Sequence, residues 1–109
     1  GDGNRAMTPG PIVSRWLELF IYDETSPSCL RWRVNRRCVK AGTAAGRLNS
    51  NGYYQVHVNG RMFLAHRVVF EMLVGAIPAG LSIDHVDRYR TNNRIENLRL
   101  VTRKNKAMK

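Results

Sequence analysis

The dipeptide Asn59-Gly60 constrains the fold of this chain more than any other short feature. It separates two runs of β-branched and aromatic residues within residues 51–65. Asn-Gly between such runs is typical of a type I′ turn, which needs positive φ at both positions and joins adjacent antiparallel strands. The sequence therefore predicts a β-hairpin, in which His57 faces away from Val56 and is an exposed or hydrogen-bonded side chain.

Regular elements are also predicted on both sides of this hairpin. Residues 11–23 have the spacing of a short helix, and residues 29–34 alternate as a half-buried strand does. Residues 65–80 have the pattern of a helix, whose end is indicated by Gly75 and Pro78. The expected apolar faces of the two helices are formed by Ile12, Trp16, Leu17 and Phe20, and by Val69, Met72 and Leu73.

Two further short strands are predicted in the last quarter of the chain, at 81–86 and 97–101. A polar loop separates them, and Thr102 could cap a final helix that continues to the last residue. We therefore expect an α+β fold, in which a small N-terminal antiparallel sheet or hairpin with a helix precedes a strand–loop–strand–helix unit at about 81–109. One domain would span 11–109, and residues 1–10 have the character of an expression remnant or a frayed terminus.

Basic residues greatly outnumber acidic ones. Eighteen Lys and Arg against eight Asp and Glu give a formal net charge of +10 over 109 residues. Such a charge attracts polyanions, and nucleic acid is the first candidate because phosphate neutralisation releases counterions. A solvated basic surface and a membrane-facing patch are the alternatives. No apolar run approaches the roughly 20 residues of a membrane span, so we expect a cytoplasmic protein without a membrane partner.

The two cysteines, Cys29 and Cys38, do not form a C-x-x-C pair. They could form one disulfide, but in an intracellular protein we expect them to be free and partly buried. The pattern gives no support for a structural zinc site.

Asp84 and His85 are neighbours in the first of the two C-terminal strands. Because adjacent side chains on a strand point to opposite faces, one can bind a metal ion while the other meets a substrate. Asn97 opens the second strand, and its amide can donate and accept across the loop. A carboxylate with an amide or imidazole suits Mg²⁺, Mn²⁺ or a similar ion, and a neutral histidine can take a proton from water. The alternative is a hydrogen-bonded surface pair beside asparagines that serve only the turns.

Two longer patterns surround these residues. The chain reads D-H-x-D-x-x-x-x-N-N-x-x-x-N-L-R-x-V-T from Asp84 to Thr102, and H-R-x-x-x-x-x-x-x-G-x-I-P-x-G from His66 to Gly80. Together they resemble the phage and homing-type branch of the HNH endonucleases, over about residues 51–106. The resemblance implies a ββα-metal fold and cleavage or nicking of DNA with one divalent cation. Mg²⁺ or Mn²⁺ is expected, although such a site also takes Zn²⁺ or Ni²⁺.

The resemblance also implies roles for single residues. Asp84 would be a metal ligand, and His85 would be the general base that activates the attacking water. Asn97 would hold the loop and so orient His85. Either Asn92 or Asn93 would brace the loop between the strands.

The final helix departs from the family pattern. The resemblance places a second metal ligand at the position of Lys106, but an ammonium group repels a cation. We therefore expect the preceding Asn105 to be the ligand. The alternative is a DNA-binding module of the same fold in which cleavage is weakened or lost.

Basic side chains around the loop would hold double-stranded DNA by its phosphates. They are Arg67, Arg88, Arg90, Arg94, Arg99, Arg103 and Lys104, although Arg67 could instead pair with Glu71. One active site per chain cuts one strand, so we expect a monomeric nicking enzyme encoded by a bacterium or phage. A basic RNA-binding protein is a further alternative, but the adjacent Tyr53 and Tyr54 face opposite ways and make a poor stacking platform.

Overall fold

The computed structural model of the chain describes residues 8–102. The elements follow in the order α2 (Ser14–Leu19), β1 (Phe20–Tyr22), β2 (Leu30–Trp32), β3 (Arg47–Leu48), β4 (Tyr54–Val58), β5 (Arg61–Leu64), α3 (Ala65–Leu73), β6 (Leu81–His85), the 3-10 turn η1 (Ile95–Asn97) and β7 (Leu98–Thr102). Within these residues the strands form three small antiparallel sheets, β1–β2, β3–β4–β5 and β6–β7. The predicted α+β fold is confirmed. The expected final helix lies outside the described residues.

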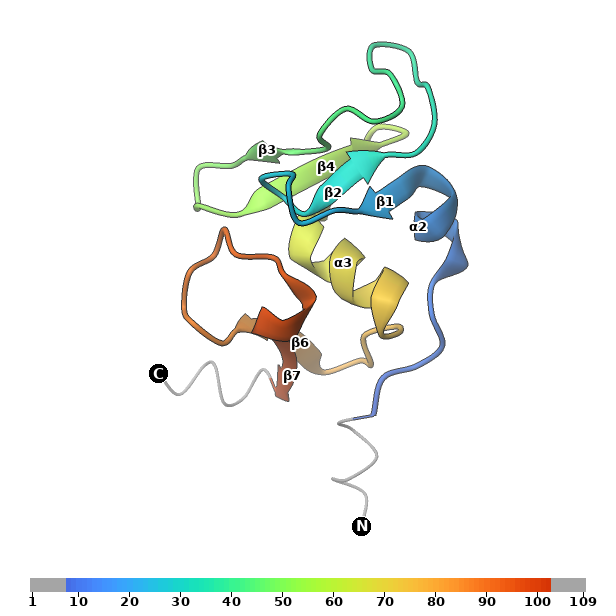
Figure 1. Cartoon of the computed structure of the whole chain (residues 1–109). Coiled ribbons are helices and arrows are strands. Elements are labelled where there is room, and N and C mark those ends of the chain that lie inside the picture. Colours follow the sequence, from blue (N-terminus) through green and yellow to red (C-terminus); the bar gives the residue numbers. More distant parts are fainter. Residues whose placement is uncertain (1–7, 103–109) are drawn as a thin grey trace.

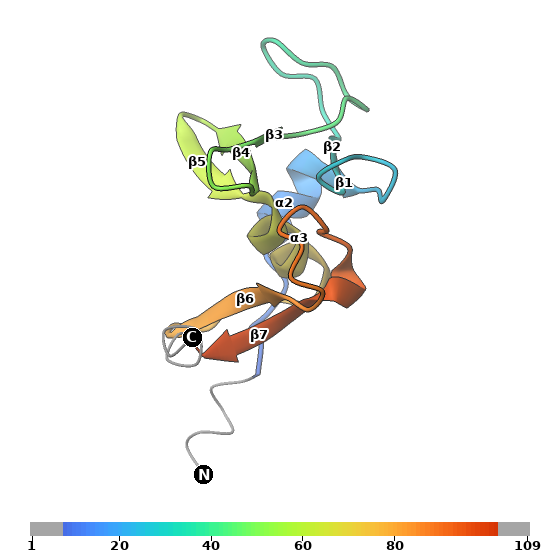
Figure 2. The same cartoon turned by 90° about the vertical axis from the view of Figure 1, so that its left-hand side faces the viewer.

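Helix α3 lies at the centre of the molecule. It runs between the sheet β3–β4–β5 and the hairpin β6–β7, as two perpendicular views show (Figure 1, Figure 2). Its side chains Val68, Val69 and Phe70 are almost fully buried. Burial of each such side chain contributes about 1.5–3 kcal/mol, so this helix is the main link between the two β-layers.

Aromatic side chains from the elements that precede α3 in the chain complete the core. Trp16 packs edge-on against Phe63, with ring centroids 4.9 Å apart, and Phe20 lies 4.6 Å from Trp32. The buried Trp16 Nε1 donates a hydrogen bond of 2.7 Å to the Glu71 carboxylate. The indole therefore joins α2 to α3 through both its ring and its polar edge.

The predicted hairpin at 51–65 is confirmed. Val58 pairs directly with Arg61, which leaves Asn59 and Gly60 as the two-residue turn with φ of 52° and 81°. These positive values are those that a type I′ turn requires. His57 is exposed, as its position on the outer face predicts.

The predicted helix at 11–23 is too long. Helix α2 ends at Leu19, because Phe20 enters strand β1 and pairs with Trp32. The helix buries Trp16, whereas Ile12 and Leu17 are 48% and 37% exposed and do not belong to an apolar face in the core. Pairing with a distant strand thus overrides the local helical spacing.

Helix α3 ends at Leu73 with Val74 as its C-cap, so the predicted helix end at Gly75 is confirmed, but Leu73 is 37% exposed and does not belong to the buried apolar face. Gly75 follows with φ of 152°, and a Cβ at this position would collide with the Gly10 carbonyl oxygen. The Gly10 N–H donates to the Ala76 carbonyl at 2.8 Å. A close approach of two backbone segments therefore requires a glycine at this helix end.

Both cysteines are free, as expected, but Cys38 is exposed while Cys29 is buried. Among the residues that the structure describes, no helix is long and apolar enough to cross a membrane.

Candidate functional site

The hairpin β6–β7 separates Asp84 from His85. The two strands pair from Leu81 opposite Thr102 to His85 opposite Leu98, and β6 alternates between buried and half-buried side chains. His85 is 6% exposed on the inner face, beside α3, whereas Asp84 is half-buried on the outer face. The strand period therefore gives the imidazole and the carboxylate two separate environments.

The buried amide of Asn93 holds the His85 ring. His85 Nε2 lies 3.0 Å from Asn93 Oδ1, and Asn93 is only 1% exposed. The other end of the same amide, Nδ2, lies 3.3 Å from the Ser28 carbonyl oxygen. Because a carbonyl only accepts, the NH₂ group must face Ser28, and Oδ1 must then accept a hydrogen bond from His85 Nε2–H. The neutral His85 ring accordingly carries its proton on Nε2, and its lone pair is on Nδ1.

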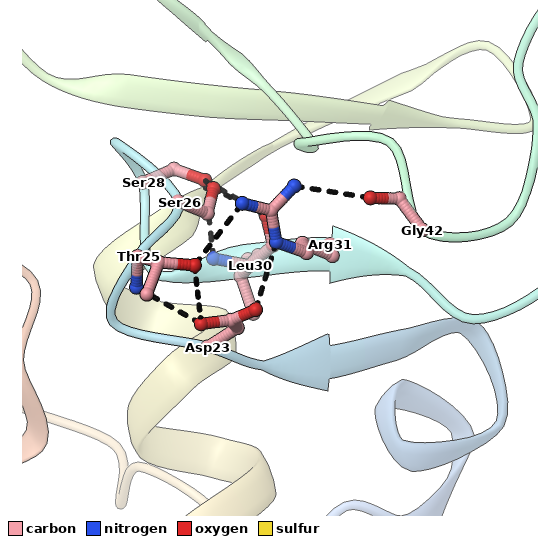
Figure 3. Close-up of polar contacts among 7 residues, drawn as sticks. All are labelled: Asp23, Thr25, Ser26, Ser28, Leu30, Arg31 and Gly42. Atoms are coloured by element: carbon pink, nitrogen blue, oxygen red, sulfur yellow. Dashed lines mark hydrogen bonds and ion pairs between the residues drawn. The ribbon is translucent and has the colours of Figure 1, made fainter.

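A tight polar turn between β1 and β2 positions the Ser28 carbonyl (Figure 3). Asp23 accepts from the backbone N–H and hydroxyl of Thr25 and from Arg31 Nε at 2.8 Å. The hydrogen bonds from Thr25, and then Arg31, hold the pKa of Asp23 below its usual value. Ser26 and Ser28 are buried, and the Ser26 hydroxyl donates to the Leu30 carbonyl at 2.7 Å. The turn is therefore a fixed support for Asn93, 65 residues further along the chain.

Cys29 ends this turn in the left-handed region, with φ of 69°. Its carbonyl accepts from the Asp23 N–H at 2.9 Å. Burial raises the pKa of the thiol to about 11, and the nearby Glu24 carboxylate adds to the shift. The side chain is therefore a protonated core group at neutral pH.

A second contact from β1 holds the segment after Asn93. The Ile95 N–H donates to the Tyr22 hydroxyl at 2.9 Å, and that hydroxyl donates to Glu24 at 2.7 Å. Burial, and then the bond to Glu24, raise the pKa of Tyr22. The neutral phenol can thus accept and donate at once, which ties the loop to the N-terminal sheet.

Asn97 organises the loop between β6 and β7. Its Oδ1 accepts from the Asp87 N–H at 3.0 Å, and its Nδ2 donates to Asp87 Oδ1 and to the Asn92 carbonyl. Asn92 Nδ2 donates to Asp87 Oδ2 at 2.7 Å. Hydrogen bonds from Asn92, the Tyr89 N–H and Asn97 hold the pKa of Asp87 below its usual value. Asn97 and Asn92 therefore lie in the loop network, whereas Asn93 is the asparagine that touches His85.

Two rings whose contact with His85 the sequence patterns did not predict lie next to it. The buried His66 ring is 4.8 Å from the His85 ring in an edge-on arrangement, and Tyr53 is 6.1 Å away. The Tyr53 and His66 rings are 5.4 Å apart. His66 stands in the quoted H-R segment, which was the available signal, whereas nothing local distinguished Tyr53 from Tyr54.

The arginines expected to contact phosphate fall into different environments. Arg90 Nη1 donates to the Asn51 carbonyl at 2.8 Å, and its guanidinium lies 5.2 Å from the Tyr53 ring centroid. Arg88 is exposed with φ of 69°, and Arg94 is exposed 3.9 Å from a Glu24 oxygen. Of these three exposed loop arginines, Arg90 lies beside Tyr53 in the His85 ring cluster, whereas Arg94 lies beside Glu24.

Arg67 and Arg99 differ from these loop arginines. Arg67 is half-buried on α3, and in residues 8–102 it makes no ion pair with Glu71, whose carboxylate accepts from Trp16. Arg99 lies opposite Asp84 in the hairpin, with Nη2 at 3.0 Å and Nε at 3.1 Å from Asp84 Oδ2. The expected basic residues Arg103 and Lys104 lie outside the described residues.

Asp84 is the expected metal ligand within the described part of the chain. Its carboxylate is one-third exposed and free of hydrogen bonds to the strand itself, so a hard divalent cation could replace the Arg99 guanidinium. Residues 8–102 contain no group of three or more His, Cys, Asp or Glu that could hold a metal ion. The partner expected from the sequence, Asn105, and Lys106 lie outside the described residues. A carboxylate with an amide oxygen would fit Mg²⁺ or Mn²⁺ by the hardness of the donors.

The geometry defines a small α+β module in which a β-hairpin carries an outward carboxylate and an inward imidazole held by an asparagine. Residues 63–108 match the family model described as "HNH endonuclease". A relative from Bacillus subtilis (strain 168), named "SPbeta prophage-derived putative HNH homing endonuclease YosQ", is 32% identical over 57 residues, which are 52% of this chain and 33% of that protein. No solved structure matches the chain. These matches confirm the resemblance to the HNH endonucleases, and the chain spans about a third of the length of the relative.

Proposed function

We propose that the chain is a metal-dependent DNA endonuclease that hydrolyses phosphodiester bonds and nicks one strand. The observation that carries the proposal is the pairing of His85 Nε2 with Asn93, which leaves Nδ1 as a lone pair inside the segment that matches HNH endonucleases. A neutral imidazole of this kind is suited to general-base chemistry near neutral pH.

In this proposal His85 Nδ1 takes a proton from the water that attacks the phosphorus. Asn93 keeps the proton on Nε2 and prevents rotation of the ring, so that the same nitrogen always faces the substrate. The His66 and Tyr53 rings pack beside the His85 ring and restrict its movement. A positioned general base typically supplies a 10²–10⁴-fold rate increase.

Asp84 and Asn105 would hold one divalent cation, Mg²⁺ or Mn²⁺ by preference. The bound cation would supply charge neutralisation for the phosphate and for the leaving 3′ oxygen. The Arg99 guanidinium balances the Asp84 carboxylate and would turn toward a DNA phosphate when that carboxylate binds the cation. The products would be a 3′-hydroxyl and a 5′-phosphate.

Double-stranded DNA is the proposed substrate because the net charge of +10 favours a polyanion, the loop after His85 carries three exposed arginines, and Arg90 lies beside the Tyr53 ring next to His85. One site per chain supports cleavage of one strand by a monomer. Arg88, Arg90 and Arg94 would position the duplex through phosphate contacts. A phage-encoded homing role is supported by the name of the Bacillus subtilis relative alone.

A supercoiled-plasmid assay tests the proposal directly. The wild-type protein is incubated with plasmid in Mg²⁺, in Mn²⁺ and in EDTA, beside His85→Ala and the surface control Glu18→Gln. We expect metal-dependent conversion to open circles by the wild type and the control, and none by His85→Ala, with DNA affinity retained in a mobility-shift assay. Cleavage by His85→Ala at the wild-type rate would exclude His85 as the base.

A second function is supported by the Asp84–Arg99 ion pair and by Lys106 at the usual ligand position. Both reduce the attraction of the site for a cation, as in a DNA-binding module that does not cleave. Intact plasmid in every metal, together with retained DNA binding, would establish this function in place of the nuclease.

A further inference from the structure

The chain contains a long stretch without any acidic residue. Between Glu24 and Glu71 no Asp or Glu occurs, while eight basic residues do. They are Arg31, Arg33, Arg36, Arg37, Lys40, Arg47, Arg61 and Arg67. The stretch includes the whole sheet β3–β4–β5 and the segment between β2 and β3, which projects from the body of the molecule at the top of Figure 1. Asp84, His85 and the hairpin β6–β7 lie outside this stretch.

An open hollow of about 490 Å³ lies in this stretch, where side chains of the projecting segment, β2 and β4 meet. It is lined by Trp32, Asn35, Arg36, Arg37, Cys38, Val39 and His57, and none of these side chains is acidic. Arg36 Nη2 donates to Asn59 Oδ1 at 3.0 Å, and its guanidinium lies 5.3 Å from the Trp32 ring centroid. Arg36 is therefore held in place, whereas Arg37 is exposed at the same hollow. Two guanidinium groups and an imidazole without a carboxylate partner favour an anion.

Strand β4 connects this hollow with the His85 site. Tyr53, immediately before β4, lies 6.1 Å from the His85 ring, and His57, near the end of the strand, lines the hollow. Because side chains alternate along a strand, Gln55 and His57 share the outer face of β4, where Arg47 is the direct partner of Gln55. Tyr53 and His57 are four residues apart, and at about 3.3 Å per residue their backbones are separated by roughly 13 Å. At 3.4 Å per base pair, this span is about four base pairs of a duplex.

We propose that the hollow binds a backbone phosphate of the DNA duplex, about four base pairs from the bond that His85 attacks. The proposal rests on the proposed function for the position of the cleaved bond, but not for the existence of the contact. Arg36 and Arg37 hold the phosphate, and the outer face of β3–β4 lies along the intervening backbone. The nuclease thereby grips its substrate at two points, one at the loop of β6–β7 and one at the projecting segment.

The salt dependence of DNA binding tests this contact. The double variant Arg36→Ala/Arg37→Ala is compared with the wild type and with Arg15→Ala/Arg33→Ala, which removes the same charge from exposed positions outside the hollow. We expect the slope of log affinity against log salt to fall by about 0.9 in the hollow variant, since one phosphate contact contributes about 0.9. Between about 50 and 200 mM salt the wild type would then lose about 3.5-fold more affinity than the hollow variant. The control should keep the wild-type slope.

Duplex length provides a second measurement. Duplexes are shortened stepwise from either side of the cleaved bond, which is mapped on the wild type. We expect wild-type affinity to fall when one flank becomes shorter than about four base pairs, and the hollow variant to be insensitive to that shortening. Rates at saturating DNA should be the same for both proteins.

The outcomes separate the two proposals. Cleavage by the wild type together with equal slopes for all three proteins would overturn the hollow and leave the nuclease intact. A slope that depends on Arg36 and Arg37 without cleavage in any metal would support the hollow and overturn the nuclease. A wild-type protein that binds no DNA would overturn both, and circular dichroism of each variant ensures that the comparison is made between folded proteins.

Discussion

Replacing Asn93 by alanine removes the group that orients His85, and its effect can be worked out from the structure. The side chain is 1% exposed, and its amide makes two buried hydrogen bonds, with His85 Nε2 and with the Ser28 carbonyl. Each bond contributes about 1 kcal/mol, and a buried N–H left without a partner costs about 1–3 kcal/mol more. Asn93→Ala should therefore lower the free energy of unfolding by about 3–5 kcal/mol. A domain of this size would then melt roughly 15–25 °C lower.

The catalytic effect has a different origin from the stability effect. Without Asn93, the His85 proton is no longer held on Nε2, and the ring can adopt either tautomer. At a temperature where both proteins are folded, we expect plasmid nicking to slow by about 10²-fold, the lower end of what a general base supplies. Nitrogen-15 NMR of the His85 ring should show the Nε2–H tautomer in the wild type and a mixture in Asn93→Ala.

Asn92→Ala is the matched control, because its amide bonds to Asp87 and not to His85. This variant should keep the Nε2–H tautomer of His85 while it loosens the loop. The reasoning would be refuted by Asn93→Ala protein that is folded, retains a single Nε2–H tautomer and nicks DNA at the wild-type rate. That result would mean that packing against His66 and Tyr53 alone orients the ring.

Two further predictions concern titrating groups outside the His85 pair. The pKa of Asp87 is lowered from 3.8 in the folded protein, so its contribution to stability is present above this value and is lost as pH falls through the lowered pKa. The melting temperature should therefore fall less for Asp87→Asn than for the wild type when the pH is lowered from about 6 to about 2. Equal falls in melting temperature for the two proteins would contradict a stabilising role of the ionised Asp87 carboxylate. With a pKa of about 11, the buried Cys29 thiol is about a thousandth ionised at pH 8, whereas Cys38 is exposed. Mass spectrometry after brief alkylation should find Cys38 modified and Cys29 intact, and equal labelling of folded protein would show that the turn before β2 opens.

Some features follow from a few consecutive residues and were predictable for that reason. The register of β4–β5 depends on the φ angles that Asn59 and Gly60 can adopt. The separation of Asp84 from His85 depends only on the two-residue period of a strand. The spacing of the asparagines after His85 indicated the family, because several residue types agree over one short segment.

Other features depend on residues far apart in the chain. The spacing allowed either Asn92 or Asn93 to brace the loop between the strands, but it did not indicate that Asn93 contacts both His85 and the Ser28 carbonyl. The same is true of the early end of α2, where Phe20 gains a strand partner that the local pattern does not reveal.

By itself, the sequence determined the turn, the alternation of the two strands and the kind of chemistry that Asp84 and His85 can perform, because backbone geometry and side-chain type act over short distances. Only the tertiary structure decided which nitrogen of His85 keeps its proton, which rings surround it, and that Arg99 balances Asp84. These contacts arise when α3 brings the sheet and the hairpin together, and the orientation of a buried hydrogen-bonding group depends on every partner that burial provides.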